Sequence, residues 1–205
     1  NTTTGQCTAS GVNLGTPTTT DNCGVQSTTN NAPANIPTGS NTVTWTVTDV
    51  HGRTASCTQM VTVTDQQAPT LASPGNQSIN AAAGTCAQSY TILDPITDNC
   101  TGATWGYVLS GATTGTLSGI VDGANSNAIS FNKGVTTVTL SGTDGANNAT
   151  TVTFTVTVAD NEAPVLTCAP AVTINTSTGL CTGTTALTAP TVTDNCTLSG
   201  SGNGL

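Results

Sequence analysis

Charged and aromatic residues are both scarce in this chain, and each scarcity removes a class of function. Only 6% of the 205 residues are charged and 3% are aromatic, and the only basic side chains are Arg53 and Lys133. A protein that binds nucleic acid neutralises phosphates with Lys and Arg, so we expect no nucleic-acid partner. The net charge of −8 also disfavours an anionic membrane surface. No apolar run approaches membrane-spanning length, and we expect no membrane insertion.

Groups suited to catalysis are equally sparse. The single histidine, His51, lies in a turn-like stretch beside Asp49 and Gly52 and has no nucleophile in a recognisable motif. The ten acidic residues are scattered singly through turns and junctions, without a carboxylate pair suited to glycoside chemistry. We therefore expect a protein that is not an enzyme.

Threonine is abundant in this chain, and in several segments it alternates with apolar residues. Val43, Trp45 and Val47 stand at every second position with threonine between them, and Val152, Phe154 and Val156 repeat the pattern. A period of two places one set on the core face of a strand and the other on its outer face. The sequence predicts an all-β fold of short strands, arranged as β-sandwiches.

A set of short motifs recurs along the chain. Asp-Asn-Cys occurs three times, and each copy follows a Gly-x-Cys and an intervening proline. The Asp-Asn-Cys cysteines are Cys23, Cys100 and Cys196, and the Gly-x-Cys cysteines are Cys7, Cys86 and Cys181. A Thr-Val block, a Thr-Asp turn and a Val-Thr-Val block follow in the same order in the first two copies.

These motifs divide the chain into three parts. Residues 1–65 form a first repeat that lacks its opening strand, and residues 66–160 form a complete repeat. Residues 161–205 form the N-terminal part of a third repeat. The complete repeat contains an insertion near residues 101–127, which reads as a long loop or an extra hairpin. No signal peptide is recognised at Asn1, so we expect mature or internal sequence of a longer polymer or polypeptide.

The eight cysteines indicate an oxidising compartment. None has CxxC or histidine-linked zinc spacing, and all lie in strand-and-turn sequence. Disulfides persist in secreted and cell-surface proteins, and a core with so few rings needs them. We expect an extracellular or cell-surface location and no cofactor other than calcium, which is considered below.

The ordered motifs resemble the hyalin repeat (HYR) domain over essentially the whole chain. They run from Ala-Pro-x-Leu-x-Cys at Ala163 through Gly-x-Cys and Asp-Asn-Cys to Val-Thr-Val. The resemblance implies tandem immunoglobulin-like, extracellular sandwiches without catalytic residues. The threonine-rich version is similar to repeats in giant bacterial surface and gliding adhesins.

Spacing predicts which cysteines pair. We expect three local bonds, Cys7–Cys23, Cys86–Cys100 and Cys181–Cys196, in which the intervening proline helps the chain reverse direction. Cys57 in a last strand and Cys168 in an opening block are both replaced in the complete repeat. Their joint loss predicts that such cysteines bond to each other within a repeat, so that the partners of Cys57 and Cys168 lie outside the segment.

Acidic residues near the repeat junctions are candidate calcium ligands. Ca²⁺ takes six to eight oxygen ligands from carboxylates, amides and carbonyls. The stretch from Asp160 to Pro164 is similar to a shortened calcium-binding linker of cadherins. The candidate ligands are Asp65, Asp98, Asp144, Asp160, Glu162 and Asp194. Each aspartate also has an ordinary role in stabilising a turn.

Two functions remain open at this stage. The leading one is a structural or adhesive segment of a surface filament or stalk, whose partners are neighbouring repeats or subunits of the same protein. The alternative is a carbohydrate- or surface-binding module, in which Trp105 and Tyr107 on the insertion stack on a glycan. A third arrangement completes the end repeats with neighbouring subunits.

Overall fold

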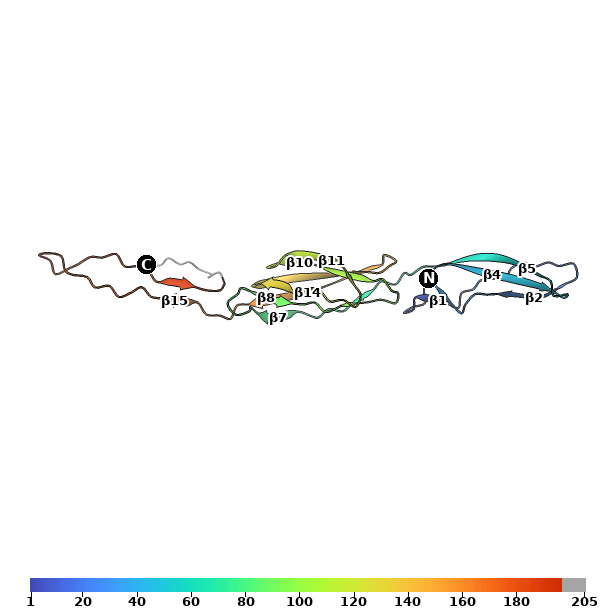
Figure 1. Ribbon diagram of the computed structural model, residues 1–205, viewed down its shortest axis with the longest axis horizontal. Helices are drawn as coiled ribbons and strands as arrows, with labels where there is room; N and C mark the ends of the chain where they lie inside the picture. Colours follow the sequence, from blue (N-terminus) through green and yellow to red (C-terminus); the bar gives the residue numbers. More distant parts are fainter. Residues whose placement is uncertain (197–205) are drawn as a thin grey trace.

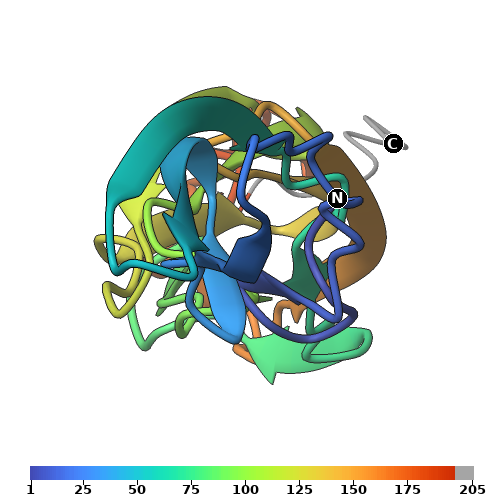
Figure 2. The ribbon, with the colours of Figure 1, turned by 90° about the vertical axis from the view of Figure 1, so that its right-hand side faces the viewer.

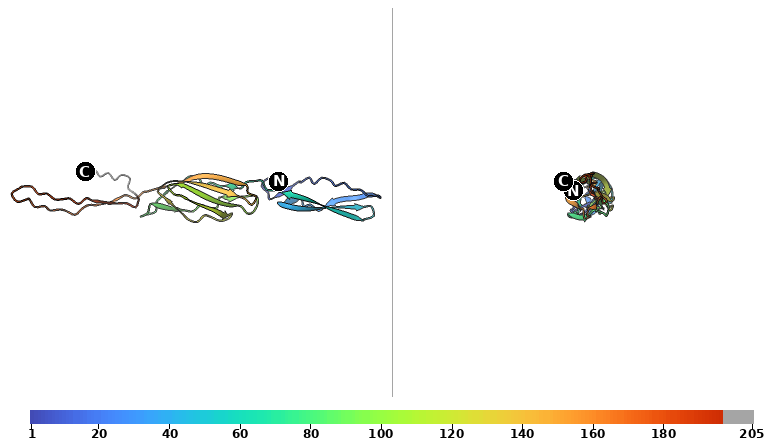
Figure 3. Two further views of the ribbon diagram at one scale, coloured as in Figure 1. Left: turned by 90° about the horizontal axis from the view of Figure 1, so that it is seen from above. Right: turned by 90° about the vertical axis from the view of Figure 1, so that its left-hand side faces the viewer.

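The computed structural model describes residues 1–196 and shows an elongated rod (Figure 1). Seen along its long axis, the molecule is narrow (Figure 2). Its parts follow one another along this axis (Figure 3). The described residues contain strands and no helix, which confirms the all-β prediction, and the sheets are sandwich-like. Among the same residues, no helix that could cross a membrane is found.

Strand pairing stays within three stretches of the chain. We call residues 1–65 unit one, residues 66–160 unit two and residues 161–196 the third segment. The last nine residues of the predicted third repeat, 197–205, lie outside the described residues.

Unit one has two small antiparallel sheets. One has the order β2-β4-β5 and the other pairs β1 with β3. The bounds are β1 (Thr8–Ser10), β2 (Val25–Asn30), β3 (Asn35–Pro37), β4 (Gly39–Asp49) and β5 (Thr54–Val63).

Unit two has a five-stranded sheet of order β11-β10-β13-β14-β7, faced by the pairs β12-β8 and β6-β9. Strand β7 runs parallel to β14, and the other pairs are antiparallel. The bounds are β6 (Thr70–Leu71), β7 (Gln77–Asn80), β8 (Ala87–Tyr90), β9 (Ile96–Thr97), β10 (Thr104–Gly111), β11 (Gly115–Val121), β12 (Ile129–Asn132), β13 (Gly134–Thr143) and β14 (Ala149–Ala159).

The sequence repeat appears as a repeated hairpin. Gly39 pairs with Val63 across β4 and β5, and Gly134 pairs with Val158 in the same register across β13 and β14. Both hairpins turn on an aspartate. The Asp49 Oδ1 atom accepts hydrogen bonds from the backbone N–H groups of His51 and Arg53, both at 2.8 Å. Asp144 makes the same two bonds in unit two.

The main core lies in unit two, between the five-stranded sheet and the strands that face it. Its buried side chains include Trp105, Phe131, Leu140 and Phe154. Unit one has a much smaller buried cluster of Ala9, Ile36 and Val63. Within the described residues β5 pairs only with β4, whereas its counterpart β14 pairs with both β13 and β7. Within residues 1–196, the outer edge of β5 is therefore unpaired.

The insertion near residues 101–127 contains a hairpin and not a long loop. It is formed by β10 and β11, and β11 extends the main sheet at its edge. The third segment has one strand pair, β15 (Val165–Thr167) with β16 (Thr191–Thr193). Leu166 of β15 pairs with Val192 of β16, in the register that joins Leu71 to Ile96 in unit two.

Candidate functional site: the disulfide-bonded junctions

Two disulfides join consecutive parts of the rod. Cys7 of unit one bonds to Cys100 of unit two, with 4.8 Å between the Cα atoms. Cys86 of unit two bonds to Cys196 of the third segment, with a Cα separation of 4.9 Å. In each case a Gly-x-Cys cysteine of one part meets the Asp-Asn-Cys cysteine of the next. The disulfides therefore link unit one to unit two and unit two to the third segment.

The predicted local pairs Cys7–Cys23, Cys86–Cys100 and Cys181–Cys196 are wrong. The chain between Cys86 and Cys100 runs along unit two, because the Cys86 carbonyl accepts a hydrogen bond from the Lys133 backbone N–H beside the start of β13, and Thr104, just after Cys100, pairs with the end of β13. Its two ends consequently lie at opposite ends of unit two, far beyond the Cα separation that a disulfide allows. A neighbouring repeat supplies the partner at each end.

Four cysteines have no partner within the described residues. Cys23, Cys57, Cys168 and Cys181 are all exposed. The prediction that opening-block and last-strand cysteines bond within a repeat stays a prediction for Cys57 and Cys168.

Asparagine side chains reinforce the first junction. The Asn99 Nδ2 atom donates to the Gln6 carbonyl at 3.2 Å and to the Asp65 carboxylate at 3.3 Å. The Asn148 Nδ2 atom donates to the carbonyls of Asp65 and Gln67, both at 3.3 Å. These contacts attach the segment after β9 and the β13–β14 turn of unit two to Gln6 and Asp65 of unit one.

The second junction has a matching contact and an ion pair. The Asn195 Nδ2 atom donates to the Thr85 carbonyl at 2.6 Å, as Asn99 does to Gln6. The ion pair joins Lys133 to Asp160, the last residue of unit two, at 3.0 Å. The Lys133 ammonium, and secondarily the Glu162 backbone N–H, hold the pKa of the Asp160 carboxyl below its ordinary value.

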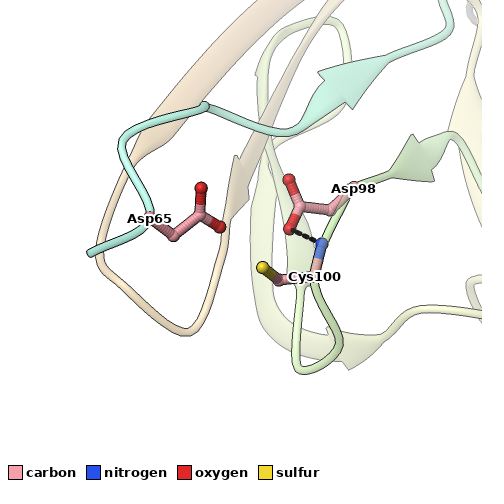
Figure 4. Close-up of side chains that lie close together, drawn as sticks. All are labelled: Asp65, Asp98 and Cys100. Carbon is pink, nitrogen blue, oxygen red and sulfur yellow. Dashed lines mark hydrogen bonds between the residues drawn. The ribbon is translucent and has the colours of Figure 1, made fainter. Parts of the chain in front are cut away.

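Each junction also gathers two of the predicted calcium ligands. Single ligand atoms of Asp65, Asp98 and Cys100 lie within 4.8 Å of one another, as do those of Asp160, Asp194 and Cys196. Figure 4 shows the Asp65 and Asp98 carboxylates facing each other beside Cys100. Both cysteines are in disulfides and supply no thiolate, so each group offers two carboxylates. Calcium binding at these pairs stays a prediction.

The other two candidate ligands are engaged elsewhere. Asp144 is 5% exposed, and its carboxylate accepts bonds from its own turn and from the Asn148 side chain. The Glu162 Oε2 atom accepts a hydrogen bond from the Gly84 backbone N–H at 2.8 Å. Neither joins the groups formed by the paired aspartates.

The aromatic side chains of the insertion are in the core. Trp105 is 1% exposed and Tyr107 is 9% exposed, and both belong to the main cluster of unit two. The prediction that they form an exposed stacking surface for a glycan is wrong, because they lie on the inner face of β10. Trp45, expected in the core, is only half-buried, and its Nε1 atom donates to Gln59 Oε1 at 2.9 Å.

The family comparison supports the resemblance over the first unit. Residues 1–63 match the family model of the HYR domain. The HYR domain is an extracellular, adhesion-related domain, and the two disulfides fit a secreted protein. No curated protein matches the chain.

The junction contacts made by Asn99, Asn148 and Lys133 were not found from the sequence. One signal pointed to the Asn99 contact: the asparagine of the HYR-like Asp-Asn-Cys tripeptide recurs in all three copies. A turn needs only the aspartate, whose carboxylate accepts the cysteine backbone N–H. The repeated asparagine therefore calls for a separate contact, which the junctions provide.

Proposed function

We propose that this chain is a tension-bearing segment of an extracellular stalk or filament and has no enzymatic activity. The observation that carries the proposal is the segment from Cys86 to Cys100, which is disulfide-bonded at both ends to different neighbours. We call residues 86–100 the strap of unit two.

The strap spans unit two from end to end. At one end, the Cys86 carbonyl accepts the Lys133 backbone N–H, next to the start of β13. At the other end, Cys100 precedes Thr104, which pairs with Thr143 at the end of β13. A strand of ten residues such as β13 is about 33 Å long. The strap therefore connects the two junctions along the axis of the rod.

The two bonds create a short covalent route through the molecule. Between Cys7 and Cys196 this route consists of one disulfide, the strap and the second disulfide. A fully stretched strap of about 15 residues reaches roughly 50 Å, whereas the main chain from Cys7 to Cys196 would reach about 650 Å. Tension along the rod therefore passes through the strap, and the sandwiches can lengthen very little.

Single-molecule stretching of the chain, held at its two ends, tests this proposal. In the oxidised protein we expect no unfolding step that adds more than about 50 Å to the length. After reduction, steps that total hundreds of ångströms are expected. The Cys86→Ser variant keeps only the first bond and releases the roughly 100 residues that follow Cys100, about 330 Å.

The Cys57→Ser variant is the matched control, because Cys57 is exposed and unbonded within the described residues. It should stretch like the oxidised wild type. Steps of hundreds of ångströms in the oxidised wild type would show that the strap does not transmit the tension.

A further inference from the structure

Within residues 1–196, one Gly-x-Cys cysteine and one Asp-Asn-Cys cysteine take part in neither disulfide. Cys181 is the Gly-x-Cys cysteine of the third segment, and Cys23 is the Asp-Asn-Cys cysteine of unit one; both are exposed. Cys181 belongs to the part of the chain beyond the second junction, and Cys23 lies in the unit before the first. Within the described residues, an unbonded Gly-x-Cys cysteine therefore lies in the third segment and an unbonded Asp-Asn-Cys cysteine lies in unit one.

The turn that carries Cys181 has the same form as the two bonded turns. The Leu180 backbone N–H donates to the Ser177 carbonyl, and the Ser177 N–H donates to the Thr182 carbonyl, both at 2.9 Å. In the turn before Cys7, Gln6 donates to Thr3 and Thr3 donates to Thr8. Thr85, Ala82 and Ala87 repeat the arrangement before Cys86. The glycine before each cysteine has a positive φ of 72–78°, which favours a residue without Cβ.

Unit one has the same two turns that, in unit two, contact the preceding unit. The Asp21 carboxylate accepts the Cys23 backbone N–H at 2.7 Å, as Asp98 does for Cys100 at 2.9 Å. The adjacent turn of Asp49 matches the Asp144 turn of unit two in its hydrogen bonds. In unit two these same two elements hold the end of unit one through Asn99 and Asn148.

A pocket of about 400 Å³ lies between the Asp21 and Asp49 turns. It is lined by Asn22, Cys23, Asp49, His51 and Arg53, among others. Asn22 is exposed, whereas its counterpart Asn99 is half-buried against the preceding unit. The surface that occupies this position in unit two is the Gly-x-Cys end of a unit of the same type, and this chain carries such an end at Cys181.

We propose that Cys181 of one copy of this chain forms a disulfide with Cys23 of a second copy. The inference rests on the proposed function, because the bond would extend the covalent, tension-bearing route from one copy of the chain to the next. By analogy with Asn99 and Asn195, the Asn22 amide of the second copy donates to the Leu180 carbonyl of the first. The contact is head-to-tail between two different surfaces, so repetition produces a filament and not a closed dimer.

The bond forms by thiol–disulfide exchange with a small disulfide oxidant such as oxidised glutathione. One thiolate attacks the oxidant and releases one thiol, and the second thiolate then displaces the other. The two cysteine sulfurs lose two electrons and two protons, and the oxidant is reduced to two thiols.

The test uses the whole chain, purified and treated with oxidised glutathione. We expect a ladder of oligomers on a non-reducing gel that returns to one band on reduction. Mass spectrometry of the ladder should find a peptide that links Cys23 to Cys181. Replacement of both Cys57 and Cys168 by serine should leave the ladder intact.

Two single variants test whether the bond joins Cys181 of one copy to Cys23 of another. Cys23→Ser and Cys181→Ser should each remain monomeric, and an equal mixture of the two should stop at a dimer. Both variants keep the Cys7–Cys100 and Cys86–Cys196 bonds. A failure of the copies to join therefore does not change the result expected from stretching a single chain. A ladder that depends on Cys57 and Cys168, a Cys181–Cys181 dimer in Cys23→Ser alone, or a wild type that stays monomeric would each overturn the proposal.

Discussion

The asparagine of the Asp-Asn-Cys tripeptide contacts the preceding unit in two of its three copies. Asn99 and Asn195 donate to the carbonyl of the residue before a bonded cysteine, Gln6 and Thr85 respectively. Asn22 has the same neighbours in sequence but is exposed. At both junctions that the structure describes, this residue type therefore contacts the preceding unit.

We expect Asn99→Ala to destabilise the first junction and Asn22→Ala to leave stability unchanged. The Asn99 side chain donates to both Gln6 and Asp65, and a typical hydrogen bond contributes about 0.5–1.5 kcal/mol. The free energy of unfolding in urea should fall by about 1–2 kcal/mol for Asn99→Ala. Equal stability of the two variants would show that the junction does not depend on this amide.

Strands were easier to predict than the partners of their cysteines. The alternation of threonine with Val43, Trp45 and Val47 predicted β4 correctly. It contained no information on whether Cys7 pairs with Cys23 or with Cys100, because each repeat offers the same motif. The interpretation of Pro95 as a reversal point was wrong, since the strap is extended on both sides of it in β8 and β9.

The burial of the rings on β10 was also misread. The surroundings of β10, rich in glycine, serine and threonine, suggested a long loop or an extra hairpin that exposes Trp105 and Tyr107. Trp105, Tyr107 and Leu109 nevertheless stand at alternate positions, and all three are buried. That period of two was the signal for a core-facing strand.

We expect Trp105→Ala to destabilise unit two strongly. The side chain is 1% exposed in the main core, and removal of a buried ring costs about 3–5 kcal/mol. Val108→Ala on the same strand is the control, because Val108 is 53% exposed and should change stability by less than about 0.5 kcal/mol. Thermal unfolding followed by circular dichroism measures both. Similar melting temperatures for the two variants would contradict the buried position of Trp105.

The whole molecule combines thin sandwiches with covalent links between them. The abundance of cysteine predicted disulfides, and two are present within the described residues. The direction of those links depends on how consecutive repeats meet, which no single repeat specifies. Closing loops of 93 and 110 residues stabilises the chain by about 4–5 kcal/mol for one such bond in the chain-entropy model.

Disulfide mapping of the native, unreduced protein by mass spectrometry tests the account most directly. Peptides linking Cys7 to Cys100 and Cys86 to Cys196 are expected. Peptides linking Cys7 to Cys23 and Cys86 to Cys100 would contradict it, because no covalent route would then run from unit to unit.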